Sequence, residues 1–171
     1  AGINDCNPLI LGNLIKNRYF DDLEFSQIVA LLSIFIKDKK LNELYFGDLN
    51  VNKEFKNMLK SVDKMCCNLN NLELKLNRSL NYQINFNYNI SLTMFNVVKS
   101  WAEGKRWNEI KEHYKKSYEG HFVRNILRLN SLIKNVNNIA KLNNDNVLLN
   151  KLDGYQEKLI RDIVINDSLY S

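Results

Sequence analysis

The sequence predicts an all-α fold, a bundle of about six to seven helices with one irregular or short β insert near residues 73–89. The first reason is that apolar residues recur at three- and four-residue spacing along most of the chain, which is the helical period. The second is that 171 residues with 45% apolar content suit a single domain with a substantial core and argue against disorder. We therefore expect residues 1–171 to form one helical-bundle domain.

Three helices are expected in the first half of the chain. Asn7 and Pro8 provide a cap and a proline at the first helical position, and the helix that follows runs to about Tyr19. Apolar residues at helical spacing predict a second helix over about 24–38. A third helix is expected over about 51–72, after the candidate caps Asn50 and Asn52.

The middle of the chain changes pattern. Residues 73–87 alternate between apolar and polar side chains, which is typical of an extended connector or a short strand pair. A helix over about 90–103 follows, and Gly104 lies where a terminating glycine is expected. A short helix is predicted over about 107–114.

The last part predicts a long helix over about 119–142 and a final helix over about 146–164, separated by a polar turn at Asn143, Asn144 and Asp145. At 100° per residue, the long helix has two faces. One face is apolar and predicted to be buried: Phe122, Ile126, Leu129, Ile133, Val136 and Ala140. The other is polar and predicted to be exposed: Arg124, Arg128, Ser131, Asn135 and Asn138.

The positive charge is concentrated around this helix. Between Lys99 and Lys134 there are nine basic and four acidic residues, which accounts for the whole formal charge of +5. A local basic excess favours a polyanionic partner, most often nucleic acid, although a solvated helical surface explains the charge equally well. For Arg124, the structural alternative is an ion pair with Glu119 or another carboxylate of the bundle.

The motifs of several enzyme classes are missing. The sequence has no GxxxxGK[ST] phosphate loop, glycine-rich dinucleotide turn or HExxH pair, so no catalytic residue, metal ligand or cofactor is predicted for this chain. His113 and His121 are interpreted as surface or packing residues. Three cysteines without CxxC spacing favour a reducing intracellular compartment, and no apolar run approaches the roughly 20 residues of a membrane span.

Three stretches resemble a known family. VVKSWAEGKRWNEIKEHYKKSYEGHFVRNILRLNSLIKN and the ending LIRDIVINDSLYS resemble the C-terminal helical (DSHCT) domain of superkiller-like DExH-box RNA helicases. Upstream, YFDDLEFSQIVALLSIFI is similar to the ratchet-helix segment of that family. Residues 45–89 match poorly. The resemblance implies a fragment of an ATP-dependent RNA helicase that is inactive alone, because ATP and Mg would bind in the parent protein.

The resemblance also implies a position beside RNA. In the family this domain closes one side of the RNA channel against two ATPase domains, and a polar residue at the end of the ratchet helix reaches the bases. The matching position is Asp38 or Lys39. In the family a second contact comes from an arginine that corresponds to Arg128, and Arg124 matches the arginine one turn earlier in the same motif. The implied partners are single-stranded RNA, the ATPase domains of the parent chain and exosome or adaptor proteins, in the nucleus or cytoplasm or from a virus, without a membrane.

Two other functions fit the same residues. The short helix, turn and long helix around Gly120 resemble a helix-turn-helix, which would make the chain a free-standing DNA-binding module. A helical scaffold that docks protein partners is the third possibility.

Overall fold

The computed structural model describes residues 8–43, 53–76, 89–114 and 116–165, except for the side chains of Pro8 and residues 65–76. The all-α class is confirmed, and the described residues form no β-sheet. They contain nine α-helical segments, more than the six to seven expected: α1 (Pro8–Lys16), α2 (Phe25–Leu32), α3 (Lys39–Asn42), α4 (Lys53–Leu76), α5 (Asn89–Ala102), α6 (Trp107–Lys111), α7 (Glu119–Leu142), α8 (Asn146–Leu152) and α9 (Tyr155–Leu159). A π-helical turn, Ile160–Ile165, follows α9.

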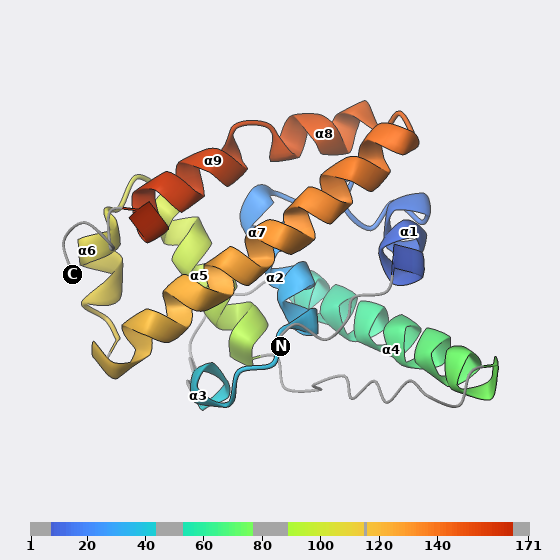
Figure 1. Ribbon diagram of the computed structural model, residues 1–171, viewed down its shortest axis with the longest axis horizontal. Helices are drawn as coiled ribbons and strands as arrows, with labels where there is room; N and C mark the ends of the chain where they lie inside the picture. The colour runs from blue at the N-terminus through green and yellow to red at the C-terminus, as the bar shows by residue number, and fades with distance from the viewer. Residues whose placement is uncertain (1–7, 44–52, 77–88, 115, 166–171) are drawn as a thin grey trace.

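Helix α2 forms the centre of the bundle. Nearly every residue of α2 is buried, including those that a one-sided surface helix would expose. A helix that is apolar on all sides is stable only when other helices surround it. Accordingly, α2 packs against both α5 and α7, and Figure 1 shows it behind the long diagonal of α7.

Helix α7 has the bounds and the two faces that the sequence predicts. All six residues of its apolar stripe are buried, and its polar stripe is exposed apart from the half-buried Arg128. The turn at residues 143–145 reverses the chain so that α8 runs back along α7 (Figure 1). Helices α1, α2 and α3 also contact α7, so it is held along its length.

The expected helix over 24–38 is wrong at its end. The α-helix stops at Leu32, one 3₁₀ turn follows at Ser33–Phe35, and Ile36 is extended. Asp38 then begins a new helix, α3. The Ser33 hydroxyl donates a hydrogen bond of 2.7 Å to the carbonyl oxygen of Val29. This side-chain donor satisfies a backbone carbonyl near the end of α2.

The final helix is also divided. Gly154 has a φ of 77°, which lies in the left-handed region that glycine adopts at little cost, and it separates α8 from α9. The insert near 73–89 is corrected in part, because α4 continues as a helix to Leu76 and α5 begins at Asn89. Residues 77–88 lie outside the described residues.

The two tryptophans anchor the core. Trp107 is buried and meets Phe122 edge to face, with 6.1 Å between the ring centroids. Trp101 contacts Phe25 and donates a hydrogen bond of 2.8 Å from Nε1 to Asp162 Oδ2. This bond ties the end of α5 to the π-helical turn. In the described part of the chain, no helix is both long and apolar enough to cross a membrane.

Candidate nucleic-acid interface

Arg124 and Arg128 lie one turn apart on α7, at the edge of its exposed face. Arg124 is exposed and Arg128 is half-buried. Among the residues that the structure describes, no carboxylate lies within 4.0 Å of the Arg124 guanidinium, so the expected alternative of a Glu119 ion pair is not formed. Arg124 therefore projects its charge from the helix towards solvent.

Asp38 lies next to this pair because α2 ends early. Its backbone is extended (φ −148°, ψ 109°), and its Oδ1 accepts hydrogen bonds from the backbone N–H groups of Lys40 (3.0 Å) and Leu41 (3.1 Å). It is thus the N-cap of α3, where a negative charge complements the helix dipole. At the other end of α3, Asn89 Nδ2 donates to the Asn42 carbonyl oxygen at 3.0 Å, which fixes α3 to α5.

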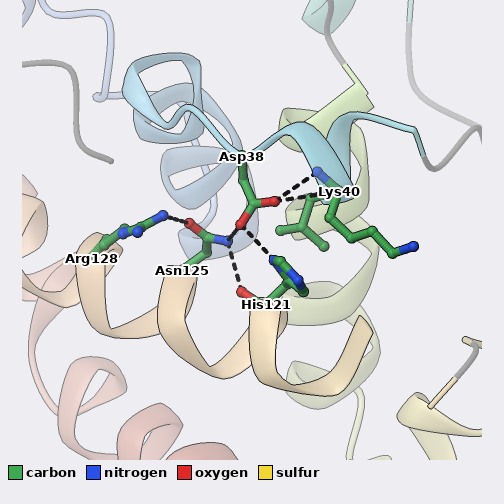
Figure 2. Close-up of polar contacts among 6 residues, drawn as sticks. Asp38, Lys40, His121, Asn125 and Arg128 are labelled. Carbon is green, nitrogen blue, oxygen red and sulfur yellow. Dashed lines mark hydrogen bonds and ion pairs between the residues drawn. The ribbon is translucent and has the colours of Figure 1, made fainter. Parts of the chain in front are cut away.

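The second carboxylate oxygen of Asp38 faces α7. Figure 2 shows that Oδ2 accepts hydrogen bonds from Asn125 Nδ2 (2.8 Å) and His121 Nδ1 (3.1 Å). The Asp38 side chain is only 5% exposed. Its oxygens therefore receive four donors from two elements that lie more than 80 residues apart in sequence.

Asn125 continues the contacts to the arginine. Its Oδ1 accepts a hydrogen bond of 2.9 Å from Arg128 Nη1, and its Nδ2 also donates to the His121 carbonyl oxygen at 2.7 Å. We call Asp38, His121, Asn125 and Arg128 the polar cluster (Figure 2). It runs from the buried cap of α3 to a cation at the surface of α7.

The pKa of Asp38 reflects this arrangement. Burial raises the pKa of the carboxyl group, because it penalises the charged form. The hydrogen bonds from Asn125, the Leu41 backbone and His121, together with the charge of His121, outweigh burial and place the pKa below the ordinary value of 3.8. Asp38 is therefore a carboxylate at neutral pH, and its charge is committed to contacts within the domain.

The four residues expected at the site are close in space but differ in accessibility. Asp38 and Arg128 belong to the polar cluster, Arg124 lies one turn away and is exposed, and Lys39 is an exposed first residue of α3. His121 and Asn125 belong to the site although the sequence did not identify them. Asn125 falls at the edge of the buried arc of α7, where a polar residue with 0% exposure needs a partner.

A hollow between α2, α5, α8 and α9 has a different character. It is lined by apolar groups and by the acidic side chains of Asp22 and Glu24. Lys151 also lines it, but its ammonium group donates to the carbonyl oxygens of Phe20 and Asp21. This surface is unsuited to phosphate, so the cationic edge of α7 is the better nucleic-acid candidate. Among the described residues, no group of three or more His, Cys, Asp or Glu side chains could hold a metal ion.

Comparisons with known proteins give the family. The DSHCT (NUC185) domain model matches residues 1–167. The chain is 30% identical over 177 residues to the antiviral helicase SKI2 of Saccharomyces cerevisiae, and this alignment covers 98% of this chain and 13% of that protein. It is 28% identical over 168 residues to the ATP-dependent RNA helicase mtr4 of Schizosaccharomyces pombe, covering 98% of this chain and 15% of the relative.

The human protein named exosome RNA helicase MTR4 is 28% identical over 174 residues, which cover 98% of this chain and 16% of that protein. The chain thus spans 13% to 16% of the length of these curated relatives. Because the family match extends over almost the entire sequence, the chain belongs to the DSHCT domain family, and the relatives it matches are RNA helicases of the superkiller-like DExH-box type.

Proposed function

We propose that this domain forms one side of the RNA channel of an ATP-dependent RNA helicase, and that Arg128 and Arg124 contact single-stranded RNA there. The observation that carries the proposal is the pair of guanidinium groups at the edge of α7, one of them hydrogen-bonded within the polar cluster. A guanidinium supplies both a charge for a phosphate and a flat surface on which a base can stack.

The roles of Asp38 and Lys39 differ in this proposal. The Asp38 carboxylate already accepts four hydrogen bonds and is almost fully buried, so it holds α3 against α7. Lys39 is exposed at the start of α3 and can add a third cation. Of the two residues expected to reach the RNA, Lys39 is therefore the better placed.

The packing of α7 favours a channel wall over a helix-turn-helix. A recognition helix must enter the major groove with an exposed face along its base-reading end. Helix α7 instead buries side chains from Phe122 to Ala140 against neighbouring helices. Only a narrow edge presents cations, which suits a strand passing alongside the helix.

The names of the relatives support an RNA-helicase context, since the antiviral protein SKI2 is called a helicase and the mtr4 and MTR4 proteins are called RNA helicases. The nucleotide chemistry belongs to other domains in this proposal, because the present chain contains no phosphate loop. ATP and Mg would bind to ATPase domains encoded upstream, and an exosome or adaptor protein would be a further partner. A gene that encodes no phosphate loop and no DExH box upstream of Ala1 would contradict the helicase assignment.

RNA binding can be tested on the chain itself. We expect weak, salt-sensitive binding of a fluorescein-labelled oligouridylate, measured by anisotropy, and weaker binding by Arg128→Ala and Arg124→Ala. If Arg128 contacts a phosphate, its loss makes the negative slope of log K against log salt less steep by about 0.7. If it stacks on a base, affinity falls while the slope stays the same.

Lys141→Ala is the matched control. Lys141 is an exposed cation on the same helix, thirteen residues from Arg128, which corresponds to roughly 20 Å along the axis. We expect this variant to bind like the wild type. Equal losses for Lys141→Ala and Arg128→Ala would indicate a general charge effect, and tighter binding of duplex DNA than of single-stranded RNA would exclude the channel role.

A further inference from the structure

Asn125 is a buried amide in the middle of a helix, where an apolar residue would be the stable choice. It has 0% exposure, and burying an amide without partners is unfavourable. Each of its polar atoms accordingly has a partner: Nδ2 donates to Asp38 and to the His121 carbonyl, and Oδ1 accepts from Arg128. The apolar period of α7 does not account for this residue.

The direction in which the amide faces follows from chemistry. The two atoms near Nδ2 are a carboxylate oxygen and a carbonyl oxygen, both of which only accept hydrogen bonds. The NH₂ group must therefore lie on that side. Because the amide is planar, its oxygen is directed to the opposite side, where the Arg128 guanidinium lies (Figure 2).

The two arginines consequently differ. Arg128 has one of its five donors fixed by Asn125 at 2.9 Å, whereas Arg124 is exposed one turn away. A long side chain loses considerable rotamer freedom when it binds a ligand. An arginine that is already held in one direction loses less of that freedom on binding.

We propose that Asn125 is a positioning residue for Arg128: its amide, oriented by Asp38 and the His121 carbonyl, sets the direction in which the Arg128 guanidinium meets a strand of RNA. This proposal rests on the proposed function for its RNA-binding consequence. The geometric part, that Asn125 orders Arg128, holds independently of the ligand.

The ligand-free test is ¹⁵N relaxation of the arginine Nε–H groups by NMR. In the wild type we expect Arg128 Nε to be clearly more ordered than Arg124 Nε. In Asn125→Thr, the hydroxyl can still donate to Asp38 or to the His121 carbonyl, but no amide oxygen remains for Arg128. We expect the order of Arg128 Nε to fall towards that of Arg124 in this variant, because the hydrogen bond to Asn125 Oδ1 is lost, and unchanged order of Arg128 would overturn the proposal.

The RNA test is a double-mutant cycle on folded variants. We expect Asn125→Thr to weaken oligouridylate binding by about two- to tenfold, the effect of releasing one immobilised side chain. In an Arg128→Ala background the same substitution should have no effect, whereas in an Arg124→Ala background it should keep its full effect. A loss of equal size in all three backgrounds would show that Asn125 acts on the fold alone.

The cycle also separates the two proposals. If Arg128→Ala binds RNA as tightly as the wild type, the proposed function fails, whatever the NMR result. If Arg128→Ala weakens binding and Asn125→Thr does not, the positioning role fails and the function stands. Should Asn125→Thr not fold, as judged by circular dichroism, Asn125→Ser is the replacement, because it retains a hydroxyl and also lacks the amide oxygen.

Discussion

Replacing Asp38 by asparagine tests the polar cluster most directly, because the change removes one charge and replaces one acceptor oxygen by an NH₂ donor with almost no change in shape. In the wild type, Oδ1 accepts from two backbone N–H groups of α3, and Oδ2 accepts from Asn125 and His121. An asparagine side chain has only one oxygen. This oxygen can either cap α3 or accept from α7, and in either case the NH₂ group faces the donors on the other side.

The magnitude follows from this conflict. If the new oxygen caps α3, the NH₂ group faces Asn125 Nδ2, which is held on that side by the His121 carbonyl. Leaving a buried donor unsatisfied costs about 1–3 kcal/mol. If the new side chain flips, the cap is lost instead, at about 1 kcal/mol, and donors of α3 face an NH₂ group. We therefore expect Asp38→Asn to lower the free energy of unfolding by about 1–3 kcal/mol.

The assay is urea unfolding at neutral pH, followed by circular dichroism, with Asp145→Asn as the control. Asp145 is also an aspartate N-cap, but in the described part of the chain its side chain accepts one hydrogen bond, from Leu148 N at 3.2 Å. Asparagine caps a helix about as well as aspartate, so we expect Asp145→Asn to change stability by less than about 0.5 kcal/mol. Equal effects of the two substitutions would refute the reasoning, since they would show that the contacts of Oδ2 with α7 contribute nothing.

Three further predictions use the same assay. The pKa of Asp38 is lowered from 3.8, so its contribution to stability is present above that pH and is lost as the pH falls through the folded-state pKa. The free energy of unfolding of the wild type should therefore exceed that of Asp38→Asn above about pH 5 and exceed it by less below that pH. A difference that grows as the pH falls below about 5 would contradict the sign. Gly104 has a φ of 97°, and the space that a methyl group would take there is open. Gly104→Ala should therefore lower the free energy of unfolding by about 1 kcal/mol through backbone strain alone, whereas Gly120→Ala, within a helix, should raise it by about 0.5–1 kcal/mol. Changes of the same sign for both variants would contradict this reasoning. Trp101→Phe retains an aromatic ring against Phe25 but loses the donor to Asp162, so we expect a loss of about 1 kcal/mol, and an unchanged midpoint would mean that water replaces the bond fully.

The sequence predicted α7 to the residue because local rules agree there. Its apolar period is unbroken from Phe122 to Ala140, and a polar turn follows directly. The end of α2 was missed because Ile34, Phe35 and Ile36 continue the apolar period after the α-helix has ended. The period shows which residues are buried but not which backbone conformation buries them.

The residue type of Asp38 favours the start of a helix and argues against the predicted helix end at this position. An aspartate is disfavoured at the negative end of a helix dipole and favoured at the start of a helix, so Asp38 was more consistent with the beginning of α3 than with the end of α2. Gly154 was a similar signal within the expected final helix. In both places the prediction followed the apolar periodicity, which continues across the residues where the helix ends.

The remaining part of the site could not be predicted from local pattern. His121 was interpreted as a surface or packing residue, and its partner Asp38 lies 83 positions away. Asn125 looked like one polar residue among many on α7. Only the tertiary arrangement shows that these side chains meet at a single carboxylate oxygen.

The sequence separation across the polar cluster has a consequence for synthesis. Asp38 and Asn125 are 87 positions apart, so their contact closes a long loop whose entropy must be offset by the rest of the bundle. Contacts of this kind form together with the global fold and slow its formation. On the ribosome, α3 emerges well before α7, and a peptide copying α7 alone would contain both arginines without the carboxylate that orients Asn125. The cationic edge is therefore completed only once the whole domain has folded, and under the proposed function a nascent or partly unfolded chain would bind RNA less well than the folded domain.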